Sequence, residues 1–255
     1  MRNITLLDKV NALSAKYGFR PSFVLDQYFV IDQGVIEREV RYGELDFSDT
    51  VLEIGPGLGF LTEQLARSVQ KVIAIEKDRR LEPVLSQELK GYGNIEYVWA
   101  DALETDWPSF NKIISNIPYS ISAPLTFKLL EYEFDKAVLC YQKEFAEKMV
   151  AQAGSNDYGR LSVMVQYYFE PKILEVVPKN AFYPQPKVDS AIVSLVRKDV
   201  KREPEFDVFI RELFRYPSKD VRNAVKIAFR KDIEDNRKLF TLDIPELRKL
   251  YEKMK

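Results

Sequence analysis

The sequence contains no histidine and a single cysteine among its 255 residues. One cysteine cannot form a disulfide within the chain, and a zinc site of Cys and His ligands needs several such side chains. A catalytic triad with histidine as its base is excluded as well. Cys140 lies in the apolar segment KAVLCY, so we expect a buried thiol that packs as a small hydrophobe. The chemistry must therefore depend on carboxylates, amides, aromatic rings, hydroxyls or a cofactor.

Long apolar runs are missing too. No run approaches the roughly 20 residues that a membrane-spanning helix needs, and the first residues, MRNITLLDKV, lack the apolar core of a signal peptide. We therefore expect a cytoplasmic protein. Hydrophobic residues make up 46% and charged residues 30% of the chain, as in ordinary globular proteins with a core. The length suits one large α/β domain with a small appendage.

The net charge of −1 is spread unevenly. Residues 201–255 hold 15 Lys/Arg and 11 Asp/Glu, whereas the remainder holds 23 and 28. A local basic patch can bind phosphates even when the whole chain is nearly neutral. A solvated helix face is the alternative interpretation of such a cluster. The basic residues that we expect to contact phosphate groups, if the patch is functional, are Arg215, Lys219, Arg222, Lys226 and Arg230.

From residue 50 onward, short runs rich in β-branched residues alternate with amphipathic helical stretches. This order predicts an α/β fold with a mostly parallel sheet covered by helices. Two later runs flank a Pro-rich loop and predict an antiparallel edge. We expect a first domain over residues 1–200, with a helical lead-in, and a small basic helical domain over residues 201–255. The predicted strands are TVLEI, KVIAIE, IEYVWA, KIISN, KAVLCY, KILEVV and AIVSLVR.

A glycine-rich turn, Gly55-Pro56-Gly57-Leu58-Gly59, joins the strand TVLEI to a predicted helix. Glycines let the backbone turn sharply and approach a ligand closely, and a helix N-terminus offers free amides. The dinucleotide fingerprint Gly-x-Gly-x-x-Gly fails because its sixth position is Phe60, and the Gly-Lys-Ser/Thr of a phosphate-binding P-loop is absent. With Glu53, the pattern instead resembles the first motif of the S-adenosylmethionine methyltransferases.

Two acids follow the next strands. Glu76 ends the strand KVIAIE, where a carboxylate can accept hydrogen bonds from ribose hydroxyls, and Asp101 follows IEYVWA, where it can accept from an adenine amine. The carboxyl ends of parallel strands share one crevice in a doubly wound sheet. The order of the glycines and the two acids therefore favours a nucleoside-containing cofactor over chance capping by exposed acids.

The strand KIISN continues into Asn116-Ile117-Pro118-Tyr119. The tetrapeptide resembles the catalytic motif of methyltransferases that act on adenine amines. The side-chain oxygen of Asn116 and the carbonyl of Ile117 can each accept one amine hydrogen, which turns the nitrogen lone pair towards a methyl donor. Pro118 fixes the backbone and removes a competing donor, and Tyr119 can stack on a base taken out of its helix. A structural Asn-Pro turn is the alternative.

The chain resembles the ribosomal RNA adenine dimethyltransferase family, on the branch that acts on small-subunit, 16S-type RNA. The likeness covers residues 19–197 and includes YQKEFAEKMVA, YGRLSVMVQYY and AFYPQPKVDSAIV, which separate this family from other methyltransferases. It implies a Rossmann-like sheet, S-adenosylmethionine as cofactor, and a substrate of two adjacent adenines, each methylated twice. It also implies that Tyr119 and Phe182 sandwich the base. The residues that it places at the cofactor are Tyr28, Val30, Gly55, Gly57, Glu76, Asp101 and Asn116.

Two motifs differ from the family pattern. The N-terminal Gly-Gln-Asn/His-Phe-Leu is Asp26-Gln27-Tyr28-Phe29-Val30 here, and Phe-x-x-Arg-Arg-Lys near the C-terminus is Phe214-Arg215-Tyr216-Pro217-Ser218-Lys219. Two other functions therefore stay open: methylation of adenine in large-subunit or other RNA, and a ribosome assembly factor of low activity that keeps the fold. We expect a monomer that binds small-subunit ribosomal RNA or a pre-ribosomal particle, and no metal.

Overall fold

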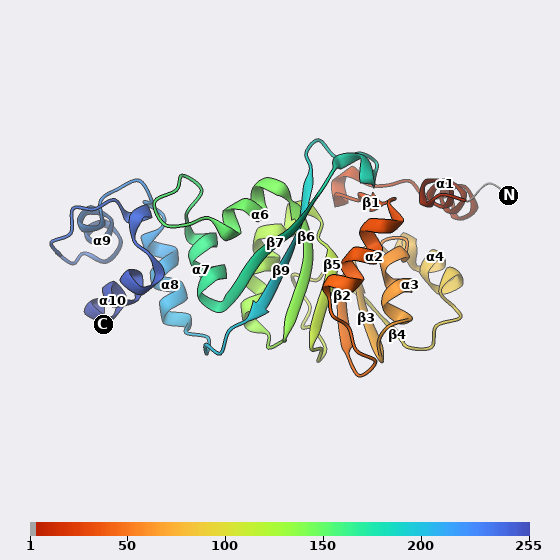
Figure 1. Ribbon diagram of the computed structural model, residues 1–255, viewed down its shortest axis with the longest axis horizontal. Coiled ribbons are helices and arrows are strands. Elements are labelled where there is room, and N and C mark those ends of the chain that lie inside the picture. Colours follow the sequence, from red (N-terminus) through yellow and green to blue (C-terminus); the bar gives the residue numbers. More distant parts are fainter. Residues whose placement is uncertain (1–3) are drawn as a thin grey trace. The chain divides into compact units, whose positions relative to one another are not determined.

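A computed structural model describes residues 4–255 (Figure 1). Contacts divide the chain into two compact units. The sheet unit comprises the described residues up to Lys143 together with Ile173–Val196, and the helical unit comprises Glu144–Lys172 with Arg197–Lys255. The domain division expected from the sequence, at residue 200, differs in placing residues 144–172 with the sheet. That segment is instead held by the C-terminal helices, for example where the Tyr168 hydroxyl donates to Asp207 at 2.6 Å.

Within residues 4–255, seven strands form the main sheet in the order β4-β3-β2-β5-β6-β9-β7. β2 pairs in parallel with β3 and β5, and these pair in parallel with β4 and β6. β9 runs antiparallel to β6, which confirms the predicted mixed sheet with an antiparallel edge. The strand bounds are β2 Thr50–Ile54, β3 Lys71–Glu76, β4 Ile95–Trp99, β5 Lys112–Asn116, β6 Lys136–Gln142, β7 Phe169–Val177 and β9 Ser190–Arg197.

The strands inside the main sheet are largely buried because their sequences are nearly continuous apolar runs, as expected for a sheet covered by helices. The edge strands, β4 and β7, are only partly buried. Cys140 lies in β6, is 3% exposed and forms no disulfide, as predicted. Helices α2 and α3 lie side by side near β2 and β3 in Figure 1. The α-helices are α1 Leu6–Tyr17, α2 Gln33–Tyr42, α3 Phe60–Ala66, α4 Glu82–Glu88, α5 Ser122–Lys128, α6 Lys143–Val150, α7 Arg160–Tyr168, α8 Pro204–Leu213, α9 Val221–Phe229 and α10 Ile244–Met254.

Short 3-10 helices connect several of these elements. They are η1 Phe23–Leu25, η2 Arg79–Leu81, η3 Tyr119–Ile121, η4 Leu129–Glu131, η5 Lys179–Ala181 and η6 Leu239–Thr241. Over residues 4–255, no helix has the length and apolar character needed to cross a membrane. The same part of the chain contains no group of His, Cys, Asp and Glu side chains arranged to hold a metal ion.

A second sheet of two short strands was not predicted. β1 Phe29–Val30 pairs antiparallel with β8 Phe182–Tyr183, so that Phe29 lies opposite Tyr183 and Val30 opposite Phe182. The amide of Ile31 also donates to the carbonyl of Ala181 at 2.8 Å. These bonds tie the N-terminal lead-in to the Pro-rich loop, segments about 150 residues apart in the sequence.

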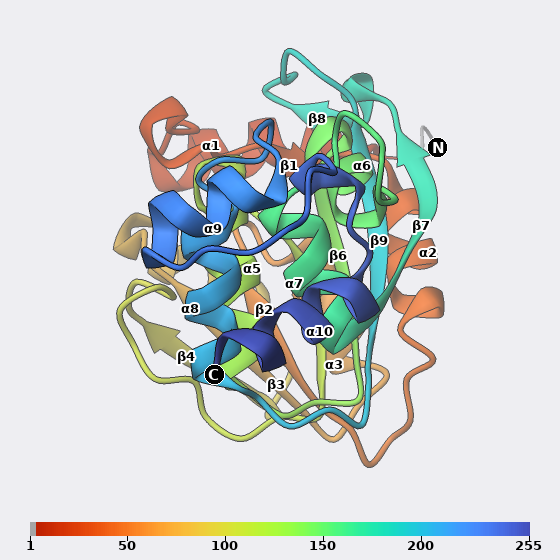
Figure 2. The same ribbon diagram turned by 90° about the vertical axis from the view of Figure 1, so that its left-hand side faces the viewer.

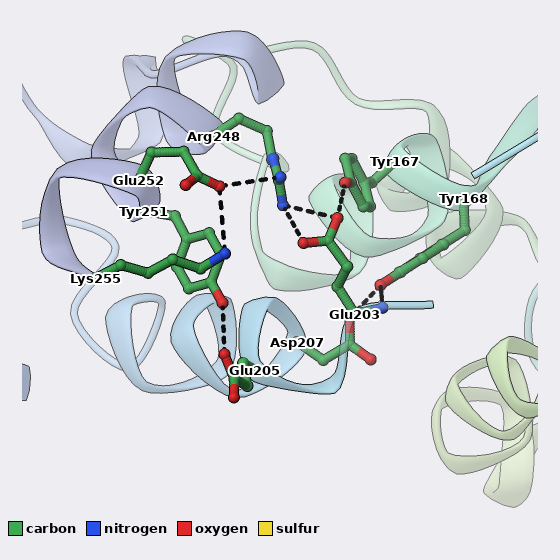
Figure 3. A network of polar contacts seen from close by, with 9 residues as sticks. All are labelled: Tyr167, Tyr168, Glu203, Glu205, Asp207, Arg248, Tyr251, Glu252 and Lys255. Atoms are coloured by element: carbon green, nitrogen blue, oxygen red, sulfur yellow. Dashed lines mark hydrogen bonds and ion pairs between the residues drawn. The ribbon is translucent and has the colours of Figure 1, made fainter. Parts of the chain in front are cut away.

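The helical unit is held together around Arg248. Figure 2 faces this unit and shows α7, α8, α9 and α10 clustered. The guanidinium of Arg248 bonds both carboxylate oxygens of Glu203, at 3.0 and 2.9 Å (Figure 3). It also lies 4.8 Å from the ring centre of Phe206. Glu203 also accepts from the Tyr167 hydroxyl at 2.8 Å. The planar guanidinium of Arg248, on α10, thus bonds a carboxylate and packs on an aromatic ring at the same time. These contacts link α10 to α7 and α8.

Replacing Arg248 with methionine should therefore destabilise the helical unit. The variant keeps an apolar side chain against the rings but leaves Glu203 without its cation, which should lower the free energy of unfolding by about 2 kcal/mol. Urea denaturation followed by circular dichroism measures the change. Arg222→Met on the exposed face of α9 is the matched control and should lie within about 0.5 kcal/mol of the unsubstituted protein. Equal stability of the two variants would contradict this account.

Candidate functional site

A cavity of about 230 Å³ opens within the sheet unit, at the carboxyl ends of β2, β3 and β5. Its walls come from the loops that follow β2, β3, β4 and β5, from residues 24–30 and from Phe182. Parallel pairing explains the convergence, because strands that run the same way end at the same edge of a sheet. The glycine turn, both predicted acids and the Asn116–Tyr119 tetrapeptide all line this one cavity.

The glycine turn approaches its neighbours too closely for side chains. Gly57 has φ +57°, and a Cβ there would lie 3.0 Å from the ring of Phe29. Gly59, the N-cap of α3, has φ +80°, and its Cβ would lie 2.8 Å from Leu89. L-residues rarely adopt this left-handed conformation, so both the backbone shape and the lack of space require glycine. Of the three glycines, Gly55 and Gly57 line the cavity, where they expose backbone without a side chain.

Glu76 ends β3 as predicted and is 7% exposed. Its Oε1 accepts from the amide of Asp78 at 2.7 Å, and its Oε2 accepts from the amide of Gly57 at 3.3 Å. Burial raises the pKa of Glu76, while these amides act in the opposite direction. The two amides orient a carboxylate whose remaining lone pairs are available to a ligand in the cavity.

Asp101 follows β4 and also lines the cavity. Its Oδ2 accepts from Lys77 Nζ at 2.6 Å, and its Oδ1 accepts from the amide of Leu103 at 2.8 Å. The bond from Lys77 lowers the pKa of Asp101, which is therefore ionised at neutral pH. The sequence predicted a hydrogen-bond acceptor at this position, and in the structure Asp101 is a charged acceptor.

Two buried acceptors at the cavity have no hydrogen-bond partner among residues 4–255. They are Glu53 Oε2, at the end of β2, and Asn116 Oδ1, at the end of β5. Burial raises the pKa of Glu53 to about 8. Buried polar atoms without partners cost free energy, and a ligand that donates hydrogen bonds to these two atoms would remove that cost.

The rest of the tetrapeptide is fixed by the sheet. The amide of Ile117 donates to the carbonyl of Cys140 at 3.1 Å, which continues the β5–β6 pairing. The Tyr119 hydroxyl and Ser190 Oγ lie 2.7 Å apart, and burial raises the pKa of Tyr119 to about 12. The Tyr119 ring is thus anchored at its outer end, and its hydroxyl keeps its proton at neutral pH.

Tyr28 stacks on Tyr119, with ring centroids 5.4 Å apart and planes at 27°. Both rings line the cavity, as do Val30 and Phe182, the opposed residues of β1 and β8. The structure therefore brings together the aromatic residues that the sequence assigned separately to the cofactor and to the base. The small sheet is what carries Tyr28 and Phe182 to the same cavity.

Asp26 occupies the position where the family pattern has glycine, and it has a left-handed backbone, φ 49°. Aspartate tolerates this conformation better than most residues. Its Oδ2 accepts from the amide of Ser120 at 2.8 Å, which ties the loop before β1 to the loop after Tyr119. Gln27 donates to Asp78 at 2.8 Å. The departure from glycine thus adds a bond between two walls of the cavity.

Comparison with known proteins assigns the family. A family model described as "Ribosomal RNA adenine dimethylase" matches residues 18–247. A probable ribosomal RNA small subunit methyltransferase A from Thermococcus gammatolerans is 46% identical over 220 residues, which cover 86% of this chain and 79% of that protein. The chain belongs to the ribosomal RNA adenine dimethylase family. It is therefore a methyltransferase.

Two solved structures have the same architecture. A dimethyladenosine transferase from Plasmodium falciparum superposes with a TM-score of 0.78 and 31% identity, over 88% of this chain and 96% of that one. The 23S rRNA methyltransferase ErmE superposes with a TM-score of 0.70 and 29% identity, over 88% and 98%. The Rossmann-like methyltransferase fold expected from the sequence is thereby confirmed.

The five basic residues expected at RNA all lie in the helical unit and are exposed. Arg222 and Lys226 are one turn apart on α9, and Arg230 follows its end. Arg215 pairs with Glu212 at 2.8 Å, and Lys226 with Asp232 at 3.5 Å. Exposed ion pairs of this kind contribute little to stability, because solvent screens them.

Sequence reasoning missed Glu39 of α2. Its Oε2 accepts from Asn116 Nδ2 at 3.1 Å. Glu39 itself is 1% exposed and does not line the cavity. A signal was present in the sequence: Val35, Ile36 and Glu39 follow the spacing of one helix face. A glutamate on an otherwise apolar face is unusual, because carboxylates are seldom fully buried without a partner.

Proposed function

We propose that this enzyme transfers methyl groups from S-adenosylmethionine to the amines of two adjacent adenines in a hairpin of small-subunit ribosomal RNA, as a step in ribosome biogenesis. The observation that carries the proposal is Asn116 Oδ1, a buried acceptor that has no hydrogen-bond partner in the described part of the chain. It lines the same cavity as the glycine turn and the aromatic residues Tyr28 and Tyr119. The relative from Thermococcus gammatolerans, named for the small subunit, supports this substrate over large-subunit RNA.

The cavity fits S-adenosylmethionine. Gly55 and Gly57 give a ligand access to the backbone, while Glu76 and Asp101 offer oriented carboxylates to ribose hydroxyls and an adenine amine. Glu53 Oε2, which has no partner among residues 4–255, suits a cationic ammonium group. We also place Tyr28, Val30 and Asn116 at the cofactor. When bound, the cofactor supplies a methyl group already activated by a sulfonium charge.

Asn116 and Ile117 hold the substrate amine in this proposal. An adenine amine is a weak nucleophile because its lone pair is delocalised into the ring. Asn116 Oδ1 and the Ile117 carbonyl each accept one amine hydrogen, which directs the lone pair towards the methyl donor. Pro118 has no amide hydrogen with which to compete. The chain needs no strong base, and Tyr119, with its raised pKa, does not act as one.

Tyr119 and Phe182 stack on the flipped adenine in this proposal. Phe182 is 4% exposed and is fixed by β8, and the Tyr119 hydroxyl is held by Ser190. Aromatic rings bind bases by stacking, whatever the base. The hydrogen-bond acceptors at Asn116 and Ile117 supply the preference for an amine.

The cofactor assignment predicts a loss of binding when Glu76 is removed. Glu76→Ala takes a charged acceptor from the ribose hydroxyls and should weaken S-adenosylmethionine binding by about 1.5–3 kcal/mol. Isothermal titration calorimetry measures this affinity. Glu82→Ala, an exposed acid of the same unit, should bind as the unsubstituted protein does. Unchanged affinity of Glu76→Ala would remove Glu76 from the cofactor site.

The catalytic assignment predicts different effects at Asn116 and Tyr119. Asn116→Ala should slow single-turnover methyl transfer by about a hundredfold or more, because the amine loses an acceptor at the reacting centre. Tyr119→Ala removes a stacking surface worth about 1–3 kcal/mol, whereas Tyr119→Phe keeps the ring and most of the rate. If Tyr119→Phe and Tyr119→Ala fail equally, the hydroxyl and not the ring matters. A near-normal rate for Asn116→Ala would make the tetrapeptide a structural turn.

We further propose that Arg215, Lys219, Arg222, Lys226 and Arg230 contact RNA phosphate. Replacing Arg222 and Lys226 together with glutamine should weaken RNA binding and reduce its salt dependence, by about 0.7–0.9 in log–log slope per lost phosphate contact. Fluorescence anisotropy at several salt concentrations measures the slope. The matched control is the double substitution of Lys249 and Lys253, also one turn apart and exposed, on α10. Equal slopes for the two double variants would mean that Arg222 and Lys226 lie on a solvated helix face and do not contact RNA.

A further inference from the structure

Glu39 is a carboxylate in an environment that disfavours charge. It lies on the buried face of α2 with Val35 and Ile36, and only 1% of it is exposed. Its Oε1 has no hydrogen-bond partner within residues 4–255, so its interaction with Asn116 is its main polar contact. An apolar side chain there would avoid the cost of burying a carboxylate. A functional role of Glu39 would therefore depend on its hydrogen bond with Asn116.

The bond to Glu39 fixes the orientation of the Asn116 amide. A side-chain amide has a donor nitrogen and an acceptor oxygen on opposite sides of one carbon, and a half-turn exchanges them. Asn116 Nδ2 points to Glu39 Oε2 at 3.1 Å, so Oδ1 is directed away from Glu39. Asn116 lines the cavity and Glu39 does not. The acceptor half of the amide is thus the half left for a ligand.

We propose that Glu39 is a positioning residue, whose carboxylate holds the Asn116 amide with Oδ1 turned towards the substrate amine. The inference rests on the proposed function, in which Asn116 Oδ1 accepts an amine hydrogen. An ionised carboxylate can only accept hydrogen bonds. It therefore binds Nδ2 and rejects Oδ1, whereas a protonated carboxyl group or a neutral amide at residue 39 would tolerate either orientation.

The surroundings of Glu39 make this control sensitive to pH. The charge of Glu175 raises the pKa of Glu39, and that of Arg38 lowers it. Glu39 in turn raises the pKa of Glu53 and of Cys140. Burial is the largest influence and raises the pKa of Glu39 to about 8, against the hydrogen bond from Asn116, which lowers it. Because the ionised form holds the productive orientation, the fraction of correctly oriented Asn116 should rise as the pH increases through 8.

The direct test is the side-chain amide signal of Asn116 in ¹⁵N–¹H NMR spectra recorded across a pH series. We expect this signal to titrate with a midpoint of about 8 in the unsubstituted protein, as Glu39 ionises. Glu39→Gln should abolish that titration. Glu37→Gln is the matched control, because it makes the same change on the exposed face of α2. A signal that does not titrate near this pH, or that titrates equally in Glu39→Gln, would overturn the proposal.

Single-turnover kinetics then test the consequence for catalysis. At a pH above 8, Glu39→Leu should slow methyl transfer by about tenfold or more, since Asn116 Nδ2 loses a charged partner. Glu39→Gln should be slower than the unsubstituted enzyme at high pH and should lose the part of the pH profile that Glu39 contributes. Glu53, also with a pKa raised to about 8, is present in both proteins, so the difference between their profiles isolates Glu39. Equal rates and profiles would contradict the proposal.

Failure of this inference can be distinguished from failure of the proposed function. If the unsubstituted protein transfers no methyl group to adenine, the proposed function is wrong, whereas the Asn116 amide titration needs no substrate and still tests the link to Glu39. If Glu39→Leu does not fold, the nearly isosteric Glu39→Gln variant and the NMR measurement decide the question.

Discussion

The parallel pairing of β2 with β3 and β5 is the constraint on which the site depends. It brings the ends of three strands to one edge, so that the glycine turn, Glu76 and Asn116 meet although they are separated along the chain. Each strand is an apolar run buried by helices, and the polar chemistry begins where the run stops. Loss of this register would separate the proposed cofactor groups from the proposed reacting amide.

Buried polar groups distinguish this edge from an ordinary loop cluster. Glu39, Glu53 and Glu76 are each at most 7% exposed, and burial raises the pKa of all three. A fold selected for stability alone would place apolar side chains there. In the proposed function, Glu53 and Glu76 bind the cofactor, Glu39 holds the Asn116 amide, and a bound amine donates to Asn116 Oδ1, which has no hydrogen-bond partner within residues 4–255.

The sequence predicted local features well and distant contacts poorly. The strands TVLEI, KVIAIE and KIISN were placed correctly because β-branched apolar runs bounded by turn residues are a local signal. The pairing of β1 with β8 was missed because two-residue strands carry no periodicity. The packing of residues 144–172 with the C-terminal helices depends on contacts such as Tyr168 with Asp207, which no local pattern reveals. Glu39 had a periodic signal, but its bond to Asn116 required the fold.

The central claim is that this site methylates adenine in small-subunit ribosomal RNA. Its most direct test is mass spectrometry of nuclease digests, after unmethylated small-subunit and large-subunit RNA or particles have been incubated separately with the protein and S-adenosylmethionine. The account predicts dimethyladenosine at two adjacent positions of one small-subunit hairpin and none in the large-subunit digest. Dimethyladenosine confined to large-subunit RNA, or no methylated adenine in either digest, would contradict it.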